Sequence, residues 1–522
     1  MKKITIIMIA IGMMLVFTAC SGGDSKKEGS SGDDQTVVIG LSSDPMNFNP
    51  DANADDDGYK IFQNIYNRLY KVNNNQEVIP DLAYEHEVSE DGLELTFHLH
   101  EDVKWHDGED FTAEDVKFTF ETIIEEKGQA SGSLTSVDEI TAPDDNTVVF
   151  HLNKPDSSLL GNIAWYGTFI MPKHIYEGTD WTDNPANKDP IGTGPFTFVE
   201  HTKGVNVTIE KNEDYFGDVP KIDKVIYSII PDANTAIQAL SNGELDILGI
   251  TAPFSEMTKL KENEQYDYGE LIWPARFQIG LNQEDENFSK LEVRQAVTYG
   301  IDKEKVVSTA LKGNGQVSKT GMVPAYENVL NTDDVFPDRD VEKGKQLLED
   351  AGYEANADGV YFSTTLDVMS GEPYEDIAAV IKESLGELGI DVKINIMETA
   401  AWTDKVWTNK NYEFSLLGGY QGPGPAGLHG RFSSDGSMNI YNYSNEELDQ
   451  NLTDAFAQVS EEDSAPYYKE AQRIIVEDIP MVPLSEWMMV DPYQDYISGH
   501  PMSDEVIDKT GFYELTYITI DK

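Results

Sequence analysis

The sequence predicts an α/β fold made of more than one domain, and three observations carry this prediction. A β-rich run over 36–41 (TVVIGL) precedes an apolar stripe at helical spacing over 59–69, an opening that suggests α/β or α+β. Near 377–396 a helical stripe, a stop at Gly389 and an alternating strand follow one another, the order from which parallel sheets are built. With 522 residues, the chain is also too long for one hydrophobic core.

The chain begins with the pattern of an export signal. Two lysines precede an apolar run over 4–17, and the small residues of the triplet TAC follow it. The run is shorter than the roughly 20 apolar residues of a membrane-spanning helix, and no later stretch is apolar enough to span. Cys20, the only cysteine, occupies the place that is acylated in bacterial lipoproteins, although Phe17 stands where leucine is usual. We therefore predict a lipoprotein signal over 1–20 with lipidation at Cys20; a chance cysteine in a secreted chain is the alternative.

The composition restricts how the protein can be stabilised and which partners it can bind. Glycine, serine and charged residues fill 21–35, which predicts a flexible tether. Without a second cysteine, stability must come from a buried core and not from disulfide bonds. Lys and Arg number 38 against 94 Asp and Glu, a formal net charge of −56 at pH 7. A field of this sign repels nucleic acid and anionic lipid surfaces, so we expect no nucleic-acid partner.

The middle of the chain is predicted to be β-rich at first and then to alternate between strands and helices. Apolar residues alternate over 93–99 and 148–152, a turn falls at 106–108 (HDG), and Thr112 is placed to cap a helix with an acidic first turn. The glycines and prolines of 190–195 (PIGTGP) mark a domain crossing or a tight turn. Later predicted strands are 196–199, 205–209, 225–230, 245–250 and 277–281. A later helix is predicted over 233–240, and a pair of helices over 293–311.

The common sequence signatures of enzymes are missing. There is no P-loop, HExxH, GxSxG elbow or paired CxxC, and the string GNG at 313–315 indicates an ordinary loop. Close carboxylate pairs arise by chance among 94 acidic residues, so they give no evidence for a glycosidase. His98 and His100 share one face of a predicted strand, where cross-strand hydrogen bonding is a simpler interpretation than a metal pair. We predict that the protein is not an enzyme and uses no cofactor and no metal.

Several short segments, in the same order and with similar gaps, carry a resemblance to a known family. They are 64–70 (NIYNRLY), 80–83 (PDLA), 89–99 (SEDGLELTFHL), 103–108 (VKWHDG), 111–116 (FTAEDV), 190–196 (PIGTGPF), 212–216 (NEDYF), 239–246 (ALSNGELD) and 293–303 (VRQAVTYGIDK). Together they resemble the family 5 solute-binding proteins, the oligopeptide-binding and dipeptide-binding proteins of ABC importers. The resemblance covers nearly the whole mature chain.

The resemblance implies a two-lobed α/β fold of the periplasmic-binding-protein type, in the class with an extra β-rich subdomain. Three domains with mixed sheets flanked by helices are expected, and the first lobe is assembled from separate segments. The expected division is signal 1–20, tether 21–35, lobe 1 at 36–71, 189–276 and 489–522, inserted subdomain 72–188, and lobe 2 at 277–488.

The function implied by the resemblance is capture of an oligopeptide or peptide-like solute by hinge closure, followed by delivery to an ABC permease. The protein would be a monomer, anchored by lipid at Cys20 to the outer face of the cytoplasmic membrane. Three alternatives remain: a binding protein for a non-peptide solute such as an oligosaccharide or other polar ligand, a surface receptor for a peptide signal, and a surface hydrolase.

The resemblance also implies a set of ligand-binding residues. Trp402 falls where the family often has a cleft tryptophan, and Gly419 with Tyr420 falls where it has a glycine and an aromatic residue on the cleft wall. Trp487 and Phe277 lie near the predicted crossings between the lobes. Core or hinge packing is the alternative role of these aromatic residues.

One departure from the family pattern follows Tyr420. Peptide-binding members usually have an aspartate there that pairs with the α-amino group of the ligand, but this chain has QGPGP from Gln421. We place Gln421 in the predicted site and expect either another reader of the amino group or a ligand without one. Asp404, Asp435 and the cluster 55–57 are candidate replacements.

Overall fold

The structure, a computed structural model, describes residues 35–52, 55–165, 167–422 and 424–521. The predicted signal, Cys20 and the predicted tether up to residue 34 lie outside these residues, as does Pro423 of the QGPGP string. Within the described part of the chain, no helix is both long and apolar enough to cross a bilayer.

A first hydrophobic core collects segments from both ends of the chain, and the elements around it are called lobe 1. Its strands are β1 (Thr36–Leu41), β2 (Tyr70–Val72), β3 (Val78–Pro80), β4 (Ala83–Val88), β5 (Glu94–Leu99), β6 (Val137–Asp144), β7 (Thr147–Leu152), β8 (Phe196–Thr202), β9 (Asn206–Lys211), β10 (Lys224–Ile229), β17 (Ile497–Ser498) and β18 (Thr519–Ile520). One sheet has the order β1-β10-β9-β8, with β1 parallel to β10. A separate antiparallel sheet has the order β4-β5-β7-β6.

The helices of this part of the molecule are short. They are α1 (Asp56–Ile65), α2 (Ala113–Glu125), α3 (Leu159–Ile163), α4 (Lys173–Tyr176), α5 (Ala233–Ser241) and α6 (Phe254–Lys261). As predicted, Thr112 precedes α2, and Asp115 completes a capping box with it. The helix α2 packs against β6 and β7, while α5 and α6 contribute to a small apolar cluster of their own.

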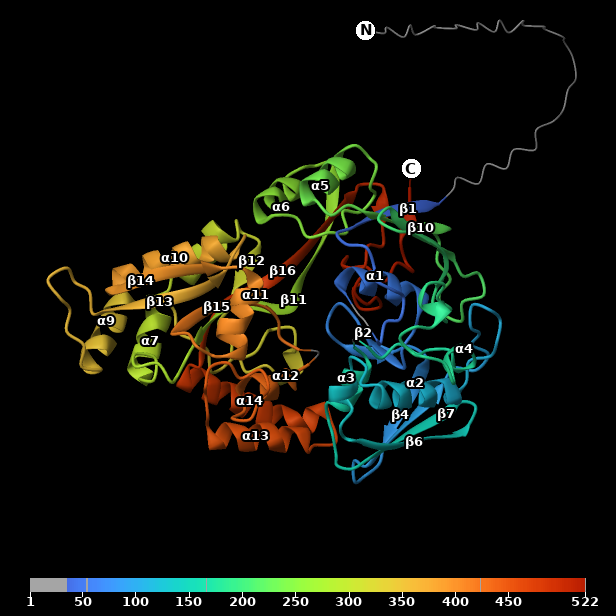
Figure 1. The fold of residues 1–522 in the computed structure, drawn as a ribbon, viewed down its shortest axis with the longest axis horizontal. Helices are drawn as coiled ribbons and strands as arrows, with labels where there is room; N and C mark the ends of the chain where they lie inside the picture. The colour runs from blue at the N-terminus through green and yellow to red at the C-terminus, as the bar shows by residue number, and fades with distance from the viewer. Residues whose placement is uncertain (1–34, 53–54, 166, 423, 522) are drawn as a thin grey trace, which may run out of the picture. The chain divides into compact units, whose positions relative to one another are not determined.

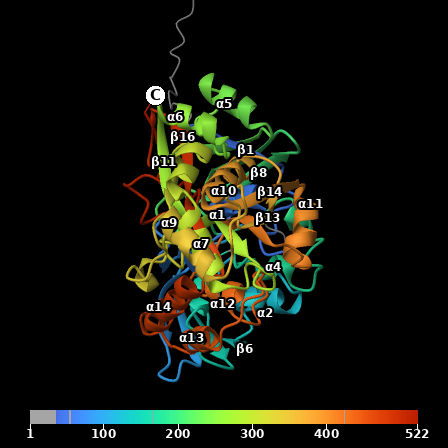
Figure 2. The same ribbon diagram turned by 90° about the vertical axis from the view of Figure 1, so that its left-hand side faces the viewer.

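A second hydrophobic core defines lobe 2. Its strands are β11 (Tyr266–Leu281), β12 (Gly315–Val317), β13 (Phe362–Met369), β14 (Ile390–Met397), β15 (Phe414–Tyr420) and β16 (Met481–Gln494). They form one mixed sheet of order β12-β16-β11-β15-β13-β14. The helices are α7 (Leu291–Gly300), α8 (Lys303–Lys305), α9 (Val341–Asp350), α10 (Tyr374–Leu388), α11 (Thr399–Trp402), α12 (Gly427–Phe432), α13 (Glu446–Phe456) and α14 (Glu461–Asp478). Figure 2 shows α13 beside α14, and these two helices pack together.

The strands β11 and β16 connect the two cores. They run side by side and antiparallel, and their first-core ends pair from Tyr266 with Gln494 to Trp273 with Trp487 (Figure 1). The register then shifts, so that Pro274 and Ala275 of β11 have no partner on β16 before Arg276 pairs with Glu486. Proline has no N–H to give to a ladder and is expected at such an interruption. The two-stranded connection is therefore interrupted where it passes from one lobe to the other.

The glycines of the PIGTGPF segment lie against the end of α1. Gly194 N–H donates to the carbonyl oxygen of Ile65 at 2.8 Å, and a Cβ on Gly194 would lie 2.6 Å from the same atom. A Cβ on Gly192 would overlap this carbonyl group even more closely. The backbone N–H of His106 donates to Gly192 at 2.9 Å, so the HDG turn and the glycine segment meet in the fold. The segment is thus a site of close backbone contact between α1 and the HDG turn.

Candidate functional site

A cavity of about 640 Å³ lies beside the paired strands β11 and β16, and residues of both lobes line it. We call it the aromatic cavity because its wall is rich in aromatic side chains. These are Trp165, Phe254, Trp273, Tyr420, Trp487, Phe512 and Tyr513. Large aromatic side chains offer broad apolar contact to a guest molecule.

Two rings from different lobes stack at the wall of the aromatic cavity. Trp165 follows α3 in lobe 1 and lies parallel to Tyr420 at the end of β15, with ring centroids 5.5 Å apart and an interplanar angle of 6°. The ring centroid of Trp273 lies 6.0 Å from that of Trp165 and 4.8 Å from that of Phe512. A stacked aromatic pair such as Trp165 and Tyr420 contributes about 0.5 to 1.5 kcal/mol beyond the area it buries. The stack therefore joins the lobes with a modest contact that opening of the cavity would break.

Two charged side chains, Asp56 and Lys60, line the aromatic cavity. Lys60 Nζ donates to Asp57 Oδ1 at 2.8 Å and to the carbonyl oxygen of Gly249 at 2.6 Å. Burial alone would raise the pKa of Asp57, but the charge and hydrogen bond of Lys60 lower it. Lys60 is therefore already neutralised, and the cavity has the mainly apolar wall with few polar groups that is typical of small-molecule sites.

The structure brings three of the predicted site residues to the aromatic cavity: Gly419, Tyr420 and Trp487. Phe277 lies behind them, 1% exposed, and its ring stacks on Trp487 at 5.3 Å. Trp402 faces the core of lobe 2, where it is 6% exposed and its Nε1 donates to Ser415 Oγ at 3.0 Å. Neither Phe277 nor Trp402 is among the residues that line this cavity.

Gln421 lies beside the cavity wall in a small cleft next to Arg276 and Arg431. Its Nε2 donates to the carbonyl oxygen of Gly419 at 2.8 Å. Arg431 donates to the carbonyl oxygen of Tyr420 at 2.5 Å and to that of Gln421 at 3.3 Å. The segment after Tyr420 is thus held by a cation, and a ligand ammonium would meet no carboxylate of this segment. Among the suggested replacements, Asp56 lines the aromatic cavity.

A buried ionic cluster lies just beyond the interruption of β11 and β16. Arg276 and Glu486 are each 1% exposed at the side chain, and Arg276 Nη2 lies 3.2 Å from Glu486 Oε1. Arg276 also donates to the carbonyl oxygen of Thr320 at 3.0 Å, and Ser318 donates to Glu486. Burial raises the pKa of Glu486 and lowers that of Arg276, and each partner opposes this shift. Loss of either partner would therefore leave the charge of the other buried without compensation.

Lys303, which is 7% exposed, lies near this cluster and makes the stability of the protein depend on pH. Burial, and then the charges of Arg276 and Lys319, lower the pKa of Lys303 from 10.5 to about 7. Between these values the unfolded chain holds a proton that the folded chain has lost, so stability rises with pH. We expect the free energy of unfolding to rise relative to that of Lys303→Met by up to about 1.4 kcal/mol per pH unit, measured by urea unfolding from pH 7 to pH 9.

The exposed Lys382 provides the matched control for this experiment. Lys382→Met should leave the pH dependence of unfolding as it is in the parent chain. Parallel curves for Lys303→Met and the parent would contradict the expected role of Lys303.

The residues that sequence reasoning missed include Trp165, Trp273 and Phe512. Trp165 lies in a loop after a five-residue helix, and Phe512 lies in the irregular C-terminal segment. Periodicity carries no signal at such positions because no repeating face exists. The string WPAR at 273–276, with a proline inside a strand-like run, was the one available signal for the interruption at the lobe crossing.

The family model described as "Bacterial extracellular solute-binding proteins, family 5 Middle" matches residues 77–439. The oligopeptide-binding protein AppA of Bacillus subtilis is 30% identical, over 96% of this chain and 97% of that protein. The dipeptide-binding protein of Escherichia coli is 26% identical over 98% of each chain.

Solved structures agree with the sequence relatives. The ABC transporter substrate-binding protein CtaP of Listeria monocytogenes superimposes with a TM-score of 0.83 at 25% identity, covering 93% of this chain and 99% of that one. AppA of Bacillus subtilis in complex with a nonapeptide gives a TM-score of 0.72 at 29% identity, covering 93% and 99% of the two chains.

Proposed function

Because the chain belongs to the family 5 bacterial extracellular solute-binding proteins, we propose that it captures an oligopeptide or peptide-like solute in the aromatic cavity for an ABC importer. The observation that carries this proposal is the aromatic cavity itself, whose wall combines Trp165 and Phe512 of lobe 1 with Tyr420 of lobe 2. A guest enclosed there leaves water, which strengthens its hydrogen bonds to the protein.

Hinge closure is the expected mechanism. The interrupted connection of β11 and β16 supports rotation of one lobe against the other. The stack of Trp165 on Tyr420 and the hydrogen bond from Ser157 Oγ to the carbonyl oxygen of Ala455 at 3.0 Å support a closed arrangement. A solute that contacts both lobes shifts the population toward the closed form. The permease then recognises that form, and the solute is released unchanged.

The protein acts outside the cytoplasm, in keeping with its family of extracellular solute-binding proteins. We propose in addition that Cys20 carries a lipid anchor at the outer face of the cytoplasmic membrane and that the protein works as a monomer. The division expected from the sequence also remains a proposal: lobe 1 at 36–71, 189–276 and 489–522, an inserted subdomain at 72–188, and lobe 2 at 277–488. The name lobe 1, as used for the structure, includes the inserted subdomain.

A non-peptide polar solute is the second candidate. Gln421 stands where a carboxylate would pair with a ligand amino group, and Arg431 holds the same segment. A buried ammonium without a partner would cost about 2 to 5 kcal/mol. A solute without a free amino group near Tyr420 avoids this cost.

Replacement of Tyr420 tests the proposed site. We expect Tyr420→Ala to weaken capture of a mixed pool of peptides by about 30-fold, because loss of a central aromatic contact costs about 2 kcal/mol or more. Capture is measured by equilibrium dialysis with mass spectrometry of the retained peptides. Tyr84, which is 51% exposed on β4, gives the control variant Tyr84→Ala, which should capture as the parent does. Equal capture by all three proteins, or recovery of cleaved peptides, would refute the proposal.

A further inference from the structure

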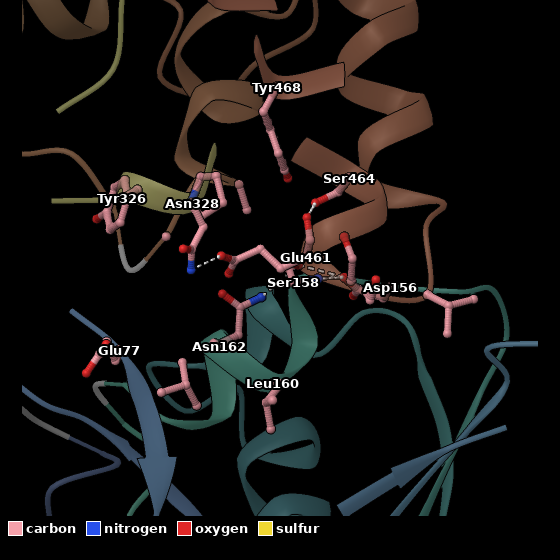
Figure 3. A pocket seen from close by; sticks show the side chains of 18 of the residues that line it. Glu77, Asp156, Ser158, Leu160, Asn162, Tyr326, Asn328, Glu461, Ser464 and Tyr468 are labelled. Atoms are coloured by element: carbon pink, nitrogen blue, oxygen red, sulfur yellow. Dashed lines mark hydrogen bonds between the residues drawn. The ribbon is translucent and has the colours of Figure 1, made fainter. Parts of the chain in front are cut away.

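A second cavity, of about 790 Å³, lies between the β-rich sheet of lobe 1 and the helical end of lobe 2. We call it the acidic cavity. Four carboxylates line it, Glu77 and Asp156 from lobe 1 and Glu327 and Glu461 from lobe 2. Its lining includes no lysine and no arginine. Figure 3 shows Glu461 of α14 and Asp156 near the start of α3 approaching the same space from opposite lobes.

The carboxylates of the acidic cavity have only neutral hydrogen-bond donors among the described residues. Asp156 accepts from Ser136 and Ser158, each at 2.6 Å, and Glu461 accepts from Asn328 Nδ2 at 3.2 Å (Figure 3). No ion pair within the described part of the chain involves any of the four carboxylates. Acidic side chains alone are common on this chain, so their presence does not by itself identify a site.

Tyr468 supplies an independent observation. It is 1% exposed, and its hydroxyl group points into the acidic cavity (Figure 3). No described residue forms a hydrogen bond with this hydroxyl group, which opens onto the acidic cavity and can bond to an occupant. Burial, and then the charges of Asp156 and Glu461, raise its pKa, so the phenol stays neutral. The tyrosine thus presents an unused acceptor and donor beside two carboxylates.

Asn162 of α3 lines both cavities. Its Nδ2 donates to Ser158 Oγ at 3.2 Å and to the carbonyl oxygen of Ser133 at 3.5 Å. Ser158 lines the acidic cavity, and Ser133 lines the aromatic cavity. The two cavities are therefore neighbours that share the side chain of Asn162 in their walls.

The chemistry of the acidic cavity selects its occupant. Carboxylates only accept hydrogen bonds, so the occupant must bring donors together with positive charge. Aliphatic side chains, among them Val88, Leu95 and Leu160, also line the cavity and suit the methylene stem of a long cationic group. An ammonium or guanidinium on an aliphatic chain meets both requirements.

We propose that the acidic cavity is a second subsite for the same solute, and that this solute carries an ammonium or guanidinium group on an aliphatic chain. The cationic group occupies the acidic cavity while an apolar part of the solute fills the aromatic cavity. This inference rests on the proposed function, since it assumes that the aromatic cavity captures a solute. It also gives the protein carboxylates that can pair with a positive charge of the ligand, which the segment after Tyr420 does not provide.

Two matched peptide pools test the inference. Both consist of hexapeptides with blocked ends and the same randomised apolar positions, and one fixed position carries lysine in the first pool and norleucine in the second. We expect the lysine pool to bind the full-length protein about 10-fold more tightly, because its charge meets four carboxylates. The difference should shrink as salt is added.

Variants of the cavity locate the effect. Glu327→Gln combined with Glu461→Gln should remove most of the lysine preference and leave norleucine binding unchanged, and Tyr468→Phe should reduce it about three-fold. Glu462→Gln, on the same helix but outside the lining, should keep the full preference. Equal binding of the two pools, or a lysine preference that persists in the double variant, would overturn the inference while leaving the proposed function standing. Failure of both pools to bind would overturn the proposed function and the inference with it.

Discussion

Replacement of Glu486 by leucine is expected to lower the free energy of unfolding by about 3 to 5 kcal/mol, because removal of one partner leaves a buried charge uncompensated. Arg276 is 1% exposed and has Glu486 as its ion-pair partner at 3.2 Å. Water cannot replace that partner, since both side chains are enclosed between β11, β16 and the segment around Ser318. Urea unfolding followed by circular dichroism measures the change.

The double variant separates the cost of a broken pair from the value of the pair. Arg276→Met combined with Glu486→Leu removes both charges and replaces them with apolar side chains of similar length. Such replacements are often neutral or stabilising, so the double variant should recover most of the lost stability. A double variant less stable than Glu486→Leu alone would contradict this expectation. It would show that the intact ion pair stabilises the fold by more than the cost of one uncompensated buried charge.

Replacement of Gly192 by alanine is expected to lower the free energy of unfolding by about 3 kcal/mol or more, beyond the usual cost of overpacking. The new methyl group would overlap the carbonyl oxygen of Ile65, a backbone atom at the end of α1. Because the opposing atom belongs to the backbone, the clash cannot be relieved by a side-chain rotation. Relief requires α1 or the glycine segment to move, and the hydrogen bond from Gly194 to Ile65 would be weakened with it.

Gly386 provides the matched control for the glycine experiment. It lies inside α10, and a Cβ there would meet no atom within 4 Å. Gly386→Ala should therefore stabilise the protein by about 0.5 to 1 kcal/mol, since alanine favours the helix. Thermal unfolding of both variants measures the contrast. A Gly192→Ala protein that unfolds with the parent would contradict the close contact with Ile65.

The predicted family and the two-lobed α/β fold class are confirmed by the comparisons. Local elements were predicted well where a short-range pattern defines them. The alternation over 93–99 is β5 (Glu94–Leu99), and α10 ends at Gly389, whose φ of 92° is the left-handed conformation that glycine favours. The helix predicted over 59–69 was too long at its C-terminal end, since α1 ends at Ile65 and Tyr66 is extended. The last carbonyl group of α1 accepts a hydrogen bond from Gly194, which is distant in the sequence.

The candidate site was predicted only in part, and the reason is geometric. Tyr420 is the last residue of β15, and Trp487 lies within β16, near the crossing between the lobes. Both residues line the aromatic cavity, as the resemblance predicted. Trp402 turns inward because Ser415 of β15 accepts its hydrogen bond, a contact that sequence spacing does not define. Trp165 and Phe512 reach the same cavity only through the fold, since Trp165 belongs to the inserted region and Phe512 to the C-terminal segment.

The gap in the ladder between β11 and β16 determines which contacts must break when the two lobes open. Pro274 and Ala275 have no partner on β16, so a bend at this place sacrifices no backbone hydrogen bond of that pairing. Opening of the lobes is then resisted by the stacked rings of Trp165 and Tyr420, a contact worth about 1 kcal/mol beyond its buried area, and by hydrogen bonds between the lobes, among them those that Ser157 donates to the carbonyl oxygens of Ala455 and Phe456. Each of these contacts is individually modest, so a guest that binds both lobes can decide the balance between the open and the closed form.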